Sequence, residues 1–498
     1  MRRVKNVELR LLTQGPNVGT PKSTVRMISY RHVHFVGIGG VGMSAIARVL
    51  LAMGLTVSGS DLKTTGTLEK LRALGARVYL GHGSGNIKGA DAVVISSAIP
   101  QDNPEVIAAQ RARVPVLQRA EMLAQIMADK RAVAVSGTHG KTTTTSMISL
   151  VLDAGGFEST VLIGGEVNDL GANARLGSGD VVVAEADESD ASFLRLTPTC
   201  AVVTNIENDH LGYYRDLGHL IDTFSLFINR VPASGSIVAS ADCPAVTELI
   251  RRFYESPKLL GDPKVITAGF DAAAAVRADD VRLADFGSAF TVHQRGEPLG
   301  EVRLRVPGRI NVHNALCAIA VGLEFGVPFE LIAQALARFR GVARRFQILY
   351  DDEALKIVDD YAHHPTAVQE TIAAARAYWA GHIVVAFQPH RYSRTAYLFR
   401  DFAHALLGAD EIIVTDIYAA GEVPLPGVRA ESIVECVRDL DAAKKVTYLP
   451  KTADVLAYLQ RTLGRGDLAL TLGAGDIGGV AHELAATLSV ADVGIGSR

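Results

Sequence analysis

The sequence predicts an α/β protein of three segments, each built around a mostly parallel β-sheet. Three observations lead to this fold class. At 498 residues the chain is too long for one ordinary hydrophobic core. Short β-rich runs alternate with helical stretches along the whole chain. Glycine-rich turns directly follow the first strand of both the first and the second segment, as is usual where a parallel strand leads into a helix.

The first segment opens with "HVHFVGIGG", a strand followed by a glycine turn, and continues with the buried strands "TVSGSD" and "AVVISSAI". The second segment begins at "RAVAVSG" and carries "DVVVAEADESD" and "CAVVTNIENDH". The third contains "LKIVDDYAHHP", "HIVVAFQPHRYSRT", "EIIVTDIY" and "LALTLGAGDIGG". We therefore expect domains at 27–118, 119–342 and 343–498, preceded by a disordered tail at 1–26 in which glycine and proline recur without apolar periodicity.

The composition is that of a soluble globular protein, with 48% apolar and 21% charged residues. A net charge of −3 without long runs of one sign argues against nucleic acid or an anionic membrane as a partner. The four cysteines are far apart and form no C-x-x-C, and no apolar run approaches the ~20 residues of a transmembrane helix. These features predict a cytoplasmic protein, and they leave open whether it is a monomer or a homodimer.

The first candidate site is the glycine turn from Gly37 to Gly42. It matches G-x-G-x-x-G between a strand and the helical stretch "MSAIARVLLAMG", and Asp61 lies 19 residues past Gly42 at the end of the next strand. Backbone amides and a helix N-terminus in this arrangement hold a diphosphate. The pattern does not distinguish NAD from another nucleotide diphosphate.

The second candidate site is the loop "SGTHGKT". It resembles a phosphate-binding loop that is shorter than G-x-x-x-x-G-K-[ST], because Val135 stands where the first glycine would be. A strand still leads into the loop and a helix follows it, so backbone amides and the helix dipole face a phosphate. Lys141 can reach β- and γ-phosphates and the Thr142 hydroxyl can bind Mg²⁺. The alternative is a threonine-rich helix start with a chance lysine.

Acidic residues follow two buried strands of the same segment. Glu185, Asp187, Glu188 and Asp190 come after "VVVA", and Asn205, Glu207 and His210 come after "AVVT". Ligands of open α/β sheets bind at such strand ends, and Mg²⁺ prefers carboxylates. Glu185 is the best magnesium candidate because it is nearest the strand end. For His210 a structural role and a ligand role stay open.

Together the motifs resemble the Mur ligase family, whose members join amino acids to a UDP-sugar. The matching strings run in family order from about residue 32 to 480: "HFVGIGGVGMS", "SGTHGKTTTT", "EADESDASFL", "TNIENDH", "GRINVHNALCA", "GVARRF", "DDYAHHPT", "FQPHRYSRT" and "GAGDIG". The resemblance implies a Rossmann-like N-terminal domain for the UDP-sugar, a central P-loop ATPase-like domain and a Rossmann-like C-terminal domain that delivers the amino acid. It also implies that the short loop is this family's own form of the phosphate-binding motif.

The reaction implied by the resemblance is ATP-driven amide formation with Mg²⁺. The lactyl carboxylate of UDP-N-acetylmuramate attacks the γ-phosphate, and the amine of L-alanine then displaces phosphate from the acyl phosphate. Phosphoryl transfer depends mainly on positioning and charge neutralisation, which Lys141 and Mg²⁺ supply.

The resemblance also implies a role for each matching residue. Lys141, Glu185 and His210 would be catalytic, and Thr142, Glu185 and His210 would bind the metal. ATP would be bound by Gly137, Thr138, His139, Gly140, Lys141, Thr142, Thr143, Asn311, Asn314, Arg345 and Asp360. The UDP-sugar would be bound by Gly37, Gly39, Gly40, Gly42 and Asp61, and alanine by Tyr361, His390, Arg391 and Arg394. Arg391 and Arg394 are three residues apart at an expected helix start, so both can face one carboxylate.

Three other functions stay open. A ligase that attaches a recycled tripeptide to the same UDP-sugar would share the loop and "HHPT". An NAD-dependent oxidoreductase would use Gly37 to Gly42 and Asp61, but it leaves Lys141 and Thr142 unexplained. A non-catalytic regulator would bind ATP without phosphate release.

Overall fold

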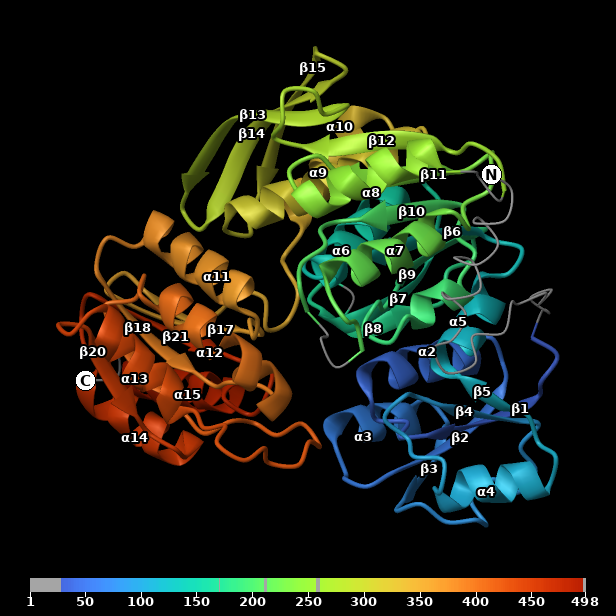
Figure 1. Cartoon of the computed structure of the whole chain (residues 1–498), viewed down its shortest axis with the longest axis horizontal. Coiled ribbons are helices and arrows are strands. Elements are labelled where there is room, and N and C mark those ends of the chain that lie inside the picture. Colours follow the sequence, from blue (N-terminus) through green and yellow to red (C-terminus); the bar gives the residue numbers. More distant parts are fainter. Residues whose placement is uncertain (1–27, 170, 210–212, 257–259, 496–498) are drawn as a thin grey trace, which may run out of the picture.

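The computed structural model describes residues 28–169, 171–209, 213–256 and 260–495 of the chain. The tail predicted to be disordered (1–26) and the metal-ligand candidate His210 lie outside the described residues. The described chain forms three lobes, each with its own sheet (Figure 1). This architecture confirms the predicted three-part α/β fold.

The first lobe contains a five-stranded, fully parallel sheet in the order β3-β2-β1-β4-β5. Its strands are β1 (His32–Val36), β2 (Thr56–Asp61), β3 (Arg77–Leu80), β4 (Ala92–Ile95) and β5 (Val116–Gln118), and its helices are α2 (Val41–Ala52), α3 (Gly66–Ala73) and α4 (Pro104–Arg111). The strand order reverses between β1 and β4, and at such a switch point the carboxyl ends of neighbouring strands open a crevice for a ligand. The glycine turn follows β1 at this place.

The central lobe is built on a ten-stranded sheet in the order β15-β14-β13-β12-β11-β10-β6-β9-β7-β8. Its strands are β6 (Arg131–Ser136), β7 (Thr160–Val167), β8 (Ala172–Arg175), β9 (Val181–Glu185), β10 (Cys200–Val203), β11 (Ser236–Ser240), β12 (Lys264–Gly269), β13 (Val276–Ala284), β14 (Gly287–Gln294) and β15 (Glu297–Leu304). Its helices are α5 (Arg119–Met127), α6 (Lys141–Ala154), a 3₁₀-helix (Ser192–Arg195), α7 (Leu217–Ile228), α8 (Pro244–Glu255), α9 (Arg309–Glu324) and α10 (Phe329–Arg338). In sheet order, the strands β13, β12, β11, β10, β6, β9 and β7 run parallel to one another. The strands β8, β14 and β15 pair antiparallel with β7, β13 and β14.

The C-terminal lobe has a six-stranded sheet in the order β16-β17-β21-β18-β19-β20, parallel except for β16. Its strands are β16 (Gln347–Asp352), β17 (Leu355–Asp360), β18 (His382–Phe387), β19 (Glu411–Val414), β20 (Lys445–Tyr448) and β21 (Asp467–Leu472). Its helices are α11 (Pro365–Tyr378), α12 (Tyr392–Leu406), α13 (Glu431–Leu440), α14 (Thr452–Thr462) and α15 (Gly478–Ile495).

The three lobes are joined in different ways. One continuous hydrophobic cluster extends from β1 and α2 of the first lobe to α7 and the 3₁₀-helix of the central lobe, and α2 packs on β7 and β8. The C-terminal lobe has clusters of its own, on the two faces of its sheet. It stands beside the central lobe in Figure 1, and polar side chains link the two. The first two lobes therefore form one packed body, which the C-terminal lobe meets through polar contacts and through the ring of Phe286, which stacks on Tyr378.

Among the described residues, every helix is too short or too polar to traverse a lipid bilayer.

Candidate active site

The short loop between β6 and α6 is held in shape by two glycines. Both have positive φ angles, +137° at Gly137 and +81° at Gly140, which side chains rarely adopt. A Cβ at Gly137 would lie 2.2 Å from Thr204 Oγ1, and one at Gly140 would lie 2.4 Å from Asn314 Oδ1. The loop thus lies directly against neighbouring strands and helices, which explains why glycine is needed at both positions of the shortened motif.

Lys141 is the first residue of α6, and its side chain folds back over the loop. Its ammonium donates to the carbonyl oxygens of Gly137 (2.5 Å) and Thr138 (3.2 Å) and to Glu188 Oε1 (2.8 Å). The lysine side chain is 15% exposed and that of Glu188 is 1% exposed. A cation is therefore fixed at the phosphate-binding end of the helix.

Thr142 and Glu185, two of the residues expected to bind magnesium, lie next to each other. The Thr142 hydroxyl donates to Glu185 Oε2 over 3.1 Å, and the amide of Gly164 donates to the same oxygen over 2.8 Å. A hydroxyl and a carboxylate at this spacing are the oxygen donors that Mg²⁺ uses in phosphate sites, where it keeps several waters. The residues present therefore fit a bound Mg²⁺.

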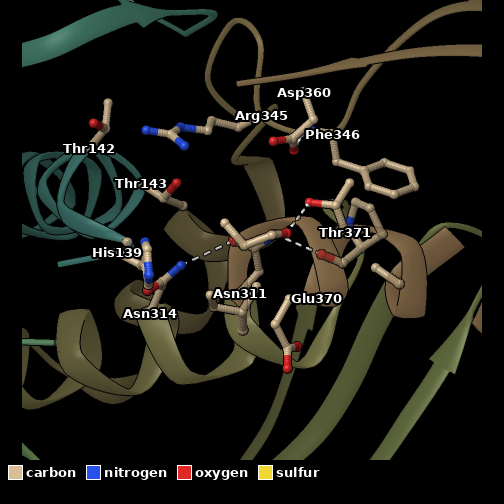
Figure 2. A pocket seen from close by; sticks show the side chains of 15 residues that line it. His139, Thr142, Thr143, Asn311, Asn314, Arg345, Phe346, Asp360, Glu370 and Thr371 are labelled. Carbon is tan, nitrogen blue, oxygen red and sulfur yellow. Dashed lines mark hydrogen bonds between the residues drawn. The ribbon is translucent and has the colours of Figure 1, made fainter. Parts of the chain in front are cut away.

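Eight of the eleven residues expected to bind ATP line one cavity beside the loop (Figure 2), whereas Gly137, Thr138 and Lys141 are not among its lining residues. Asn311 and Asn314 of α9 are joined by a hydrogen bond of 3.2 Å, and Thr144 donates to Asn314. Arg345 extends from the linker toward Thr142 and Thr143, as Figure 2 shows. The cavity is lined by His139, Gly140, Thr142, Thr143, Pro307, Ile310, Asn311, Asn314, Arg345, Phe346, Asp360, Ala367, Glu370, Thr371 and Ala374. Residues separated by more than 200 positions in the sequence thus lie around one cavity.

Asp360, the predicted ribose contact, is held by the backbone of its own lobe. Its carboxylate accepts hydrogen bonds from the amides of Phe346 (2.6 Å) and Ala362 (2.7 Å). Burial raises the pKa of Asp360 to about 6, although Arg345 and the two amides oppose this rise. The side chain borders the cavity and also fixes the linker that carries Arg345 and Phe346.

The glycine turn of the first lobe is closed by Asp61. Its carboxylate accepts hydrogen bonds from the amides of Gly39 (2.9 Å) and Leu62 (2.8 Å), and a Cβ on Gly39 would lie 2.8 Å from Oδ2. Gly40 is the N-cap of α2. Asp61 therefore shapes the turn itself, in addition to standing where a ribose hydroxyl would bind.

Arg119 links this turn to the central lobe and was not anticipated from the sequence. Its Nη2 lies 2.9 Å from Asp187 Oδ2, and a Cβ on Gly42 would lie 2.8 Å from its Nη1. Asp187 was one of the four acidic candidates after β9. The contact brings the acidic loop of the central lobe close to the diphosphate motif of the first lobe.

A second cavity, of about 350 Å³, lies where the three lobes meet. The first lobe contributes Val41, Ser44, Arg48, Thr67 and Lys70; the central lobe contributes Thr142, Gly164, Gly165, Glu166, Ala172 and Asn173; and the linker and C-terminal lobe contribute Val342, Ala343, Arg344, Arg345 and Tyr361. Thr142 and Arg345 border both cavities. A ligand in the second cavity would thus reach the phosphate end of a nucleotide in the first.

Three of the four predicted alanine-binding residues lie near the carboxyl ends of the C-terminal strands. Arg394 Nη1 lies 3.3 Å from His390 Nδ1, and the ring of His363 packs edge-on against the rings of both Tyr361 and His390. Burial and the positive charges of Arg394 and Arg391 lower the pKa of His390 to about 4. His390 is therefore a neutral imidazole at physiological pH, and its surroundings disfavour protonation.

The fourth residue, Arg391, does not lie beside Arg394 as expected. It is the N-cap of α12 with a φ of +72°, so it is not yet part of the helix and the three-residue helical spacing does not apply. Its side chain is half exposed, 3.8 Å from Glu422, whereas Arg394 pairs with Asp209 of the central lobe at 3.1 Å. The two arginines thus face different carboxylates in this structure.

Two further residues, one that contacts Lys141 and one that lines the first cavity, were not singled out from the sequence. Glu188 was considered only as one of four acids, yet it is the partner of Lys141. Glu370 lines the first cavity, and burial together with the charge of Glu207 raises its pKa. Helical spacing could have identified Glu370, because it shares one face of α11 with Ala367, Thr371 and Ala374, which also line the cavity.

Comparison with known proteins agrees with this arrangement. Residues 32–131 match the Mur ligase family catalytic domain, 135–322 the Mur ligase middle domain and 344–475 the Mur ligase glutamate ligase domain. The UDP-N-acetylmuramate–L-alanine ligase of Geobacter sp. (strain M21) is 47% identical over 92% of this chain and 98% of its own. That of Trichlorobacter lovleyi is 48% identical over 89% of this chain and 96% of its own.

Two solved structures are similar over the same length. The UDP-N-acetylmuramate–alanine ligase of Thermotoga maritima has a TM-score of 0.78 at 30% identity and covers 92% of this chain and 99% of its own. A murein peptide ligase from Psychrobacter arcticus has a TM-score of 0.67 at 23% identity over 92% of this chain and 98% of its own, which shows a common fold. With relatives above 45% identity over nearly its whole length, this chain belongs to the Mur ligase family.

Proposed function

We propose that this chain is an ATP-dependent ligase that joins L-alanine to the lactyl carboxylate of UDP-N-acetylmuramate, with release of ADP and phosphate. Relatives named UDP-N-acetylmuramate–L-alanine ligase that span almost the whole chain support this function. The observation that carries it is the second cavity. It begins beside the glycine turn of the first lobe and ends at Thr142 and Arg345, next to the ATP cavity.

We assign one substrate to each domain: the UDP-sugar to 27–118, ATP to 119–342 and alanine to 343–498. Gly37, Gly39, Gly40, Gly42 and Asp61 would bind the UDP diphosphate. ATP would be bound by the loop from Gly137 to Thr143, by Asn311 and Asn314, and by Arg345 and Asp360. The contacts between Asp61 and Gly39, and between Gly140 and Asn314, support this assignment because they fix the two phosphate-binding turns.

The chemistry requires a leaving group, because a carboxylate is a poor electrophile. The lactyl carboxylate attacks the γ-phosphorus of ATP, ADP leaves, and an acyl phosphate forms. Lys141 would neutralise the charge on the transferred phosphoryl group. Thr142 and Glu185 would hold Mg²⁺, which supplies further charge neutralisation when bound.

Alanine would then attack the acyl carbonyl and displace phosphate. We assign its carboxylate to Arg394 and its immediate surroundings to Tyr361 and His390, with Arg391 as a more distant cation. The amine must lose a proton before attack, and we assign this proton to solvent, because the lowered pKa of His390 makes its imidazole a weak base. Closure of the C-terminal domain on the central one would bring this pocket to the acyl phosphate.

The test is a phosphate-release assay with each substrate omitted in turn. We expect release only when ATP, UDP-N-acetylmuramate and L-alanine are all present, together with a product whose mass equals the UDP-sugar plus one alanine residue. Activity with a tripeptide but not with alanine would favour the recycling ligase. A change in NADH absorbance would favour the oxidoreductase, and ATP binding without any release would favour a regulator.

A further inference from the structure

Two histidines and a glutamate meet where the C-terminal lobe touches the central lobe. His139 belongs to the phosphate-binding loop, Glu207 follows β10, and His364 is the N-cap of α11. His139 Nε2 lies 3.3 Å from Glu207 Oε2, and His364 Nδ1 lies 3.7 Å from the same oxygen. One nitrogen from each ring and one carboxylate oxygen all lie within 4.8 Å of one another.

These spacings are close to those of ligands around one metal ion. Zinc bonds of ~2.0–2.1 Å with tetrahedral angles place ligand atoms about 3.3 Å apart. The distance from His139 to Glu207 already has this value. The distance from His364 to Glu207 is longer by a few tenths of an ångström, and that from His364 to His139 by up to about 1.5 Å. A rotation of the His364 ring or a small approach of α11 would bring all three ligand atoms to zinc spacing.

His364 is the strongest indication that the cluster has a ligand. The residue is 6% exposed, and neither ring nitrogen has a hydrogen-bond partner within the described part of the chain. A buried polar atom without a partner is unfavourable by about 1–3 kcal/mol. The ordinary alternative, a structural histidine in a hydrogen-bonded network, does not account for an unsatisfied Nδ1 atom that lies 3.7 Å from a carboxylate.

Glu207 is oriented as metal-binding carboxylates usually are. The Thr366 hydroxyl donates to Oε2 over 2.6 Å, and the Glu207 amide donates to Thr138 Oγ1 over 2.9 Å. Hydroxyl groups that hold a ligating carboxylate in place are typical of the shell around metal ligands. Thr366 comes from α11, so a residue of the C-terminal lobe holds this carboxylate of the central lobe.

We propose that His139, Glu207 and His364 form a binding site for a transition-metal dication such as Zn²⁺, at the joint between the central and C-terminal domains. Two imidazoles and one carboxylate suit zinc rather than Mg²⁺, which prefers oxygen ligands. The site is separate from the magnesium position at Thr142 and Glu185. A bound ion links the ATP loop to the start of α11, so it favours the arrangement in which the two domains touch. This inference does not depend on the proposed reaction.

The test uses the full-length protein without nucleotide and in excess Mg²⁺. Zn²⁺ is titrated against a chromophoric chelator, and Co²⁺ is used as a spectroscopic substitute that reports tetrahedral coordination without thiolate ligands. The variants are Glu207→Gln and His364→Asn. The matched control is His293→Gln, because His293 also lies 3.3 Å from a carboxylate, that of Asp279, but on the β14 hairpin without a second histidine.

We expect one Zn²⁺ per chain, a tetrahedral Co²⁺ spectrum and a higher melting temperature with Zn²⁺. Each ligand variant should lose at least about tenfold in affinity, and the control should lose none. Circular dichroism and the metal-free melting temperature identify a variant that has failed to fold. Unchanged affinity in a folded His364→Asn or Glu207→Gln protein, or a thiolate signature in the Co²⁺ spectrum, would overturn the proposal.

Discussion

The Nζ atom of Lys141 lies 2.8 Å from Oε1 of Glu188, and both side chains are largely withdrawn from solvent. Burial alone would lower the pKa of the lysine, but the carboxylates of Glu188, Glu185 and Asp187 outweigh it and raise the pKa above its ordinary value. Lys141 is therefore fully charged at physiological pH, and Glu188 holds it over the loop. The lysine thus places a positive charge at the candidate site and also neutralises a buried carboxylate.

Replacing Lys141 by alanine should lower kcat by about a hundredfold or more, because one charge contact to the transferred phosphoryl group is lost. The structure adds a second expectation, since the substitution leaves the buried Glu188 without its cation and should lower the melting temperature. Initial rates at saturating substrates and thermal melts measure the two effects separately. A nearly normal rate would remove the loop from the mechanism.

The double variant Lys141→Met with Glu188→Gln separates charge pairing from catalysis. It removes both charges while it keeps similar volumes, so stability should return towards that of the parent protein while activity stays low. Recovery of activity in the double variant would mean that Lys141 acts only by neutralising Glu188.

Asp61→Ala should weaken UDP-N-acetylmuramate binding and leave ATP binding unchanged. The carboxylate holds the amide of Gly39 in the glycine turn, and a charged acceptor of this kind contributes about 1.5–3 kcal/mol, or roughly ten- to a hundredfold in affinity. Calorimetric titration of each ligand alone measures this. Asp102→Ala, at an exposed position of the same lobe, is the control. A loss of ATP affinity in Asp61→Ala would contradict the assignment of substrates to domains.

Glu105→Gln should make stability less dependent on pH. Glu105 is fully buried, 3.6 Å from His34, and accepts hydrogen bonds from Ser60 (2.5 Å) and Asn86 (2.6 Å). Burial raises its pKa, but these partners outweigh burial and bring the pKa down to about 2. A carboxyl whose pKa is lower in the folded than in the unfolded protein stabilises the fold above pH ~4.5, by roughly 2–3 kcal/mol here, and loses this contribution as the pH falls toward about 2.

The difference in melting temperature between the parent protein and Glu105→Gln should therefore be largest near neutral pH and shrink below about pH 5. Glu69→Gln is the control, because Glu69 is 60% exposed and pairs with Arg72 of its own helix. A difference that stays constant from pH 8 to pH 4 would show that Glu105 acts through packing alone.

Much of the fold could be predicted because the parallel strands are short runs with apolar centres, and β1 and β6 lead into glycine turns. The strands β4 and β10 are buried at every position, which is the pattern of a sheet covered on both faces. The antiparallel extension from β13 to β15 was not anticipated. Its strands alternate buried with partly exposed residues and carry several charges, so they are less apolar than the central strands.

The site residues could be found where a motif places several of them on one turn, as with Lys141 and Thr142. Contacts between distant segments could not be read from spacing. Gly140 lies against Asn314, and Arg119 reaches Asp187, only because the sheet order brings their segments together. The orientation of Arg391 also escaped prediction, because the helix begins one residue later than the spacing argument assumed.

The last prediction concerns the alanine pocket and begins from the contact between Arg394 and Asp209. Both side chains are 9% exposed, and the contact crosses from the C-terminal to the central lobe. The Nε atom of Arg394 has no hydrogen-bond partner within the described residues, so the guanidinium retains a donor for a small carboxylate. Arg394 is thus in a position to bind alanine and to join two domains, and a substitution must distinguish these roles.

We expect Arg394→Ala to raise the KM for alanine by roughly ten- to a hundredfold, since a buried charge-assisted hydrogen bond is worth about 1.5–3 kcal/mol. Arg394→Lys should recover only part of this, because an ammonium cannot reproduce the guanidinium fork.

Arg391→Ala should have a smaller effect on the KM for alanine, because its side chain is half exposed and near Glu422. Arg400→Ala, at an exposed position of the same helix, should have none. Initial rates against alanine concentration at saturating ATP and UDP-sugar provide the measurement. An equal rise in the KM for ATP would instead assign Arg394 to holding the domains together, and an unchanged alanine KM would move the pocket elsewhere.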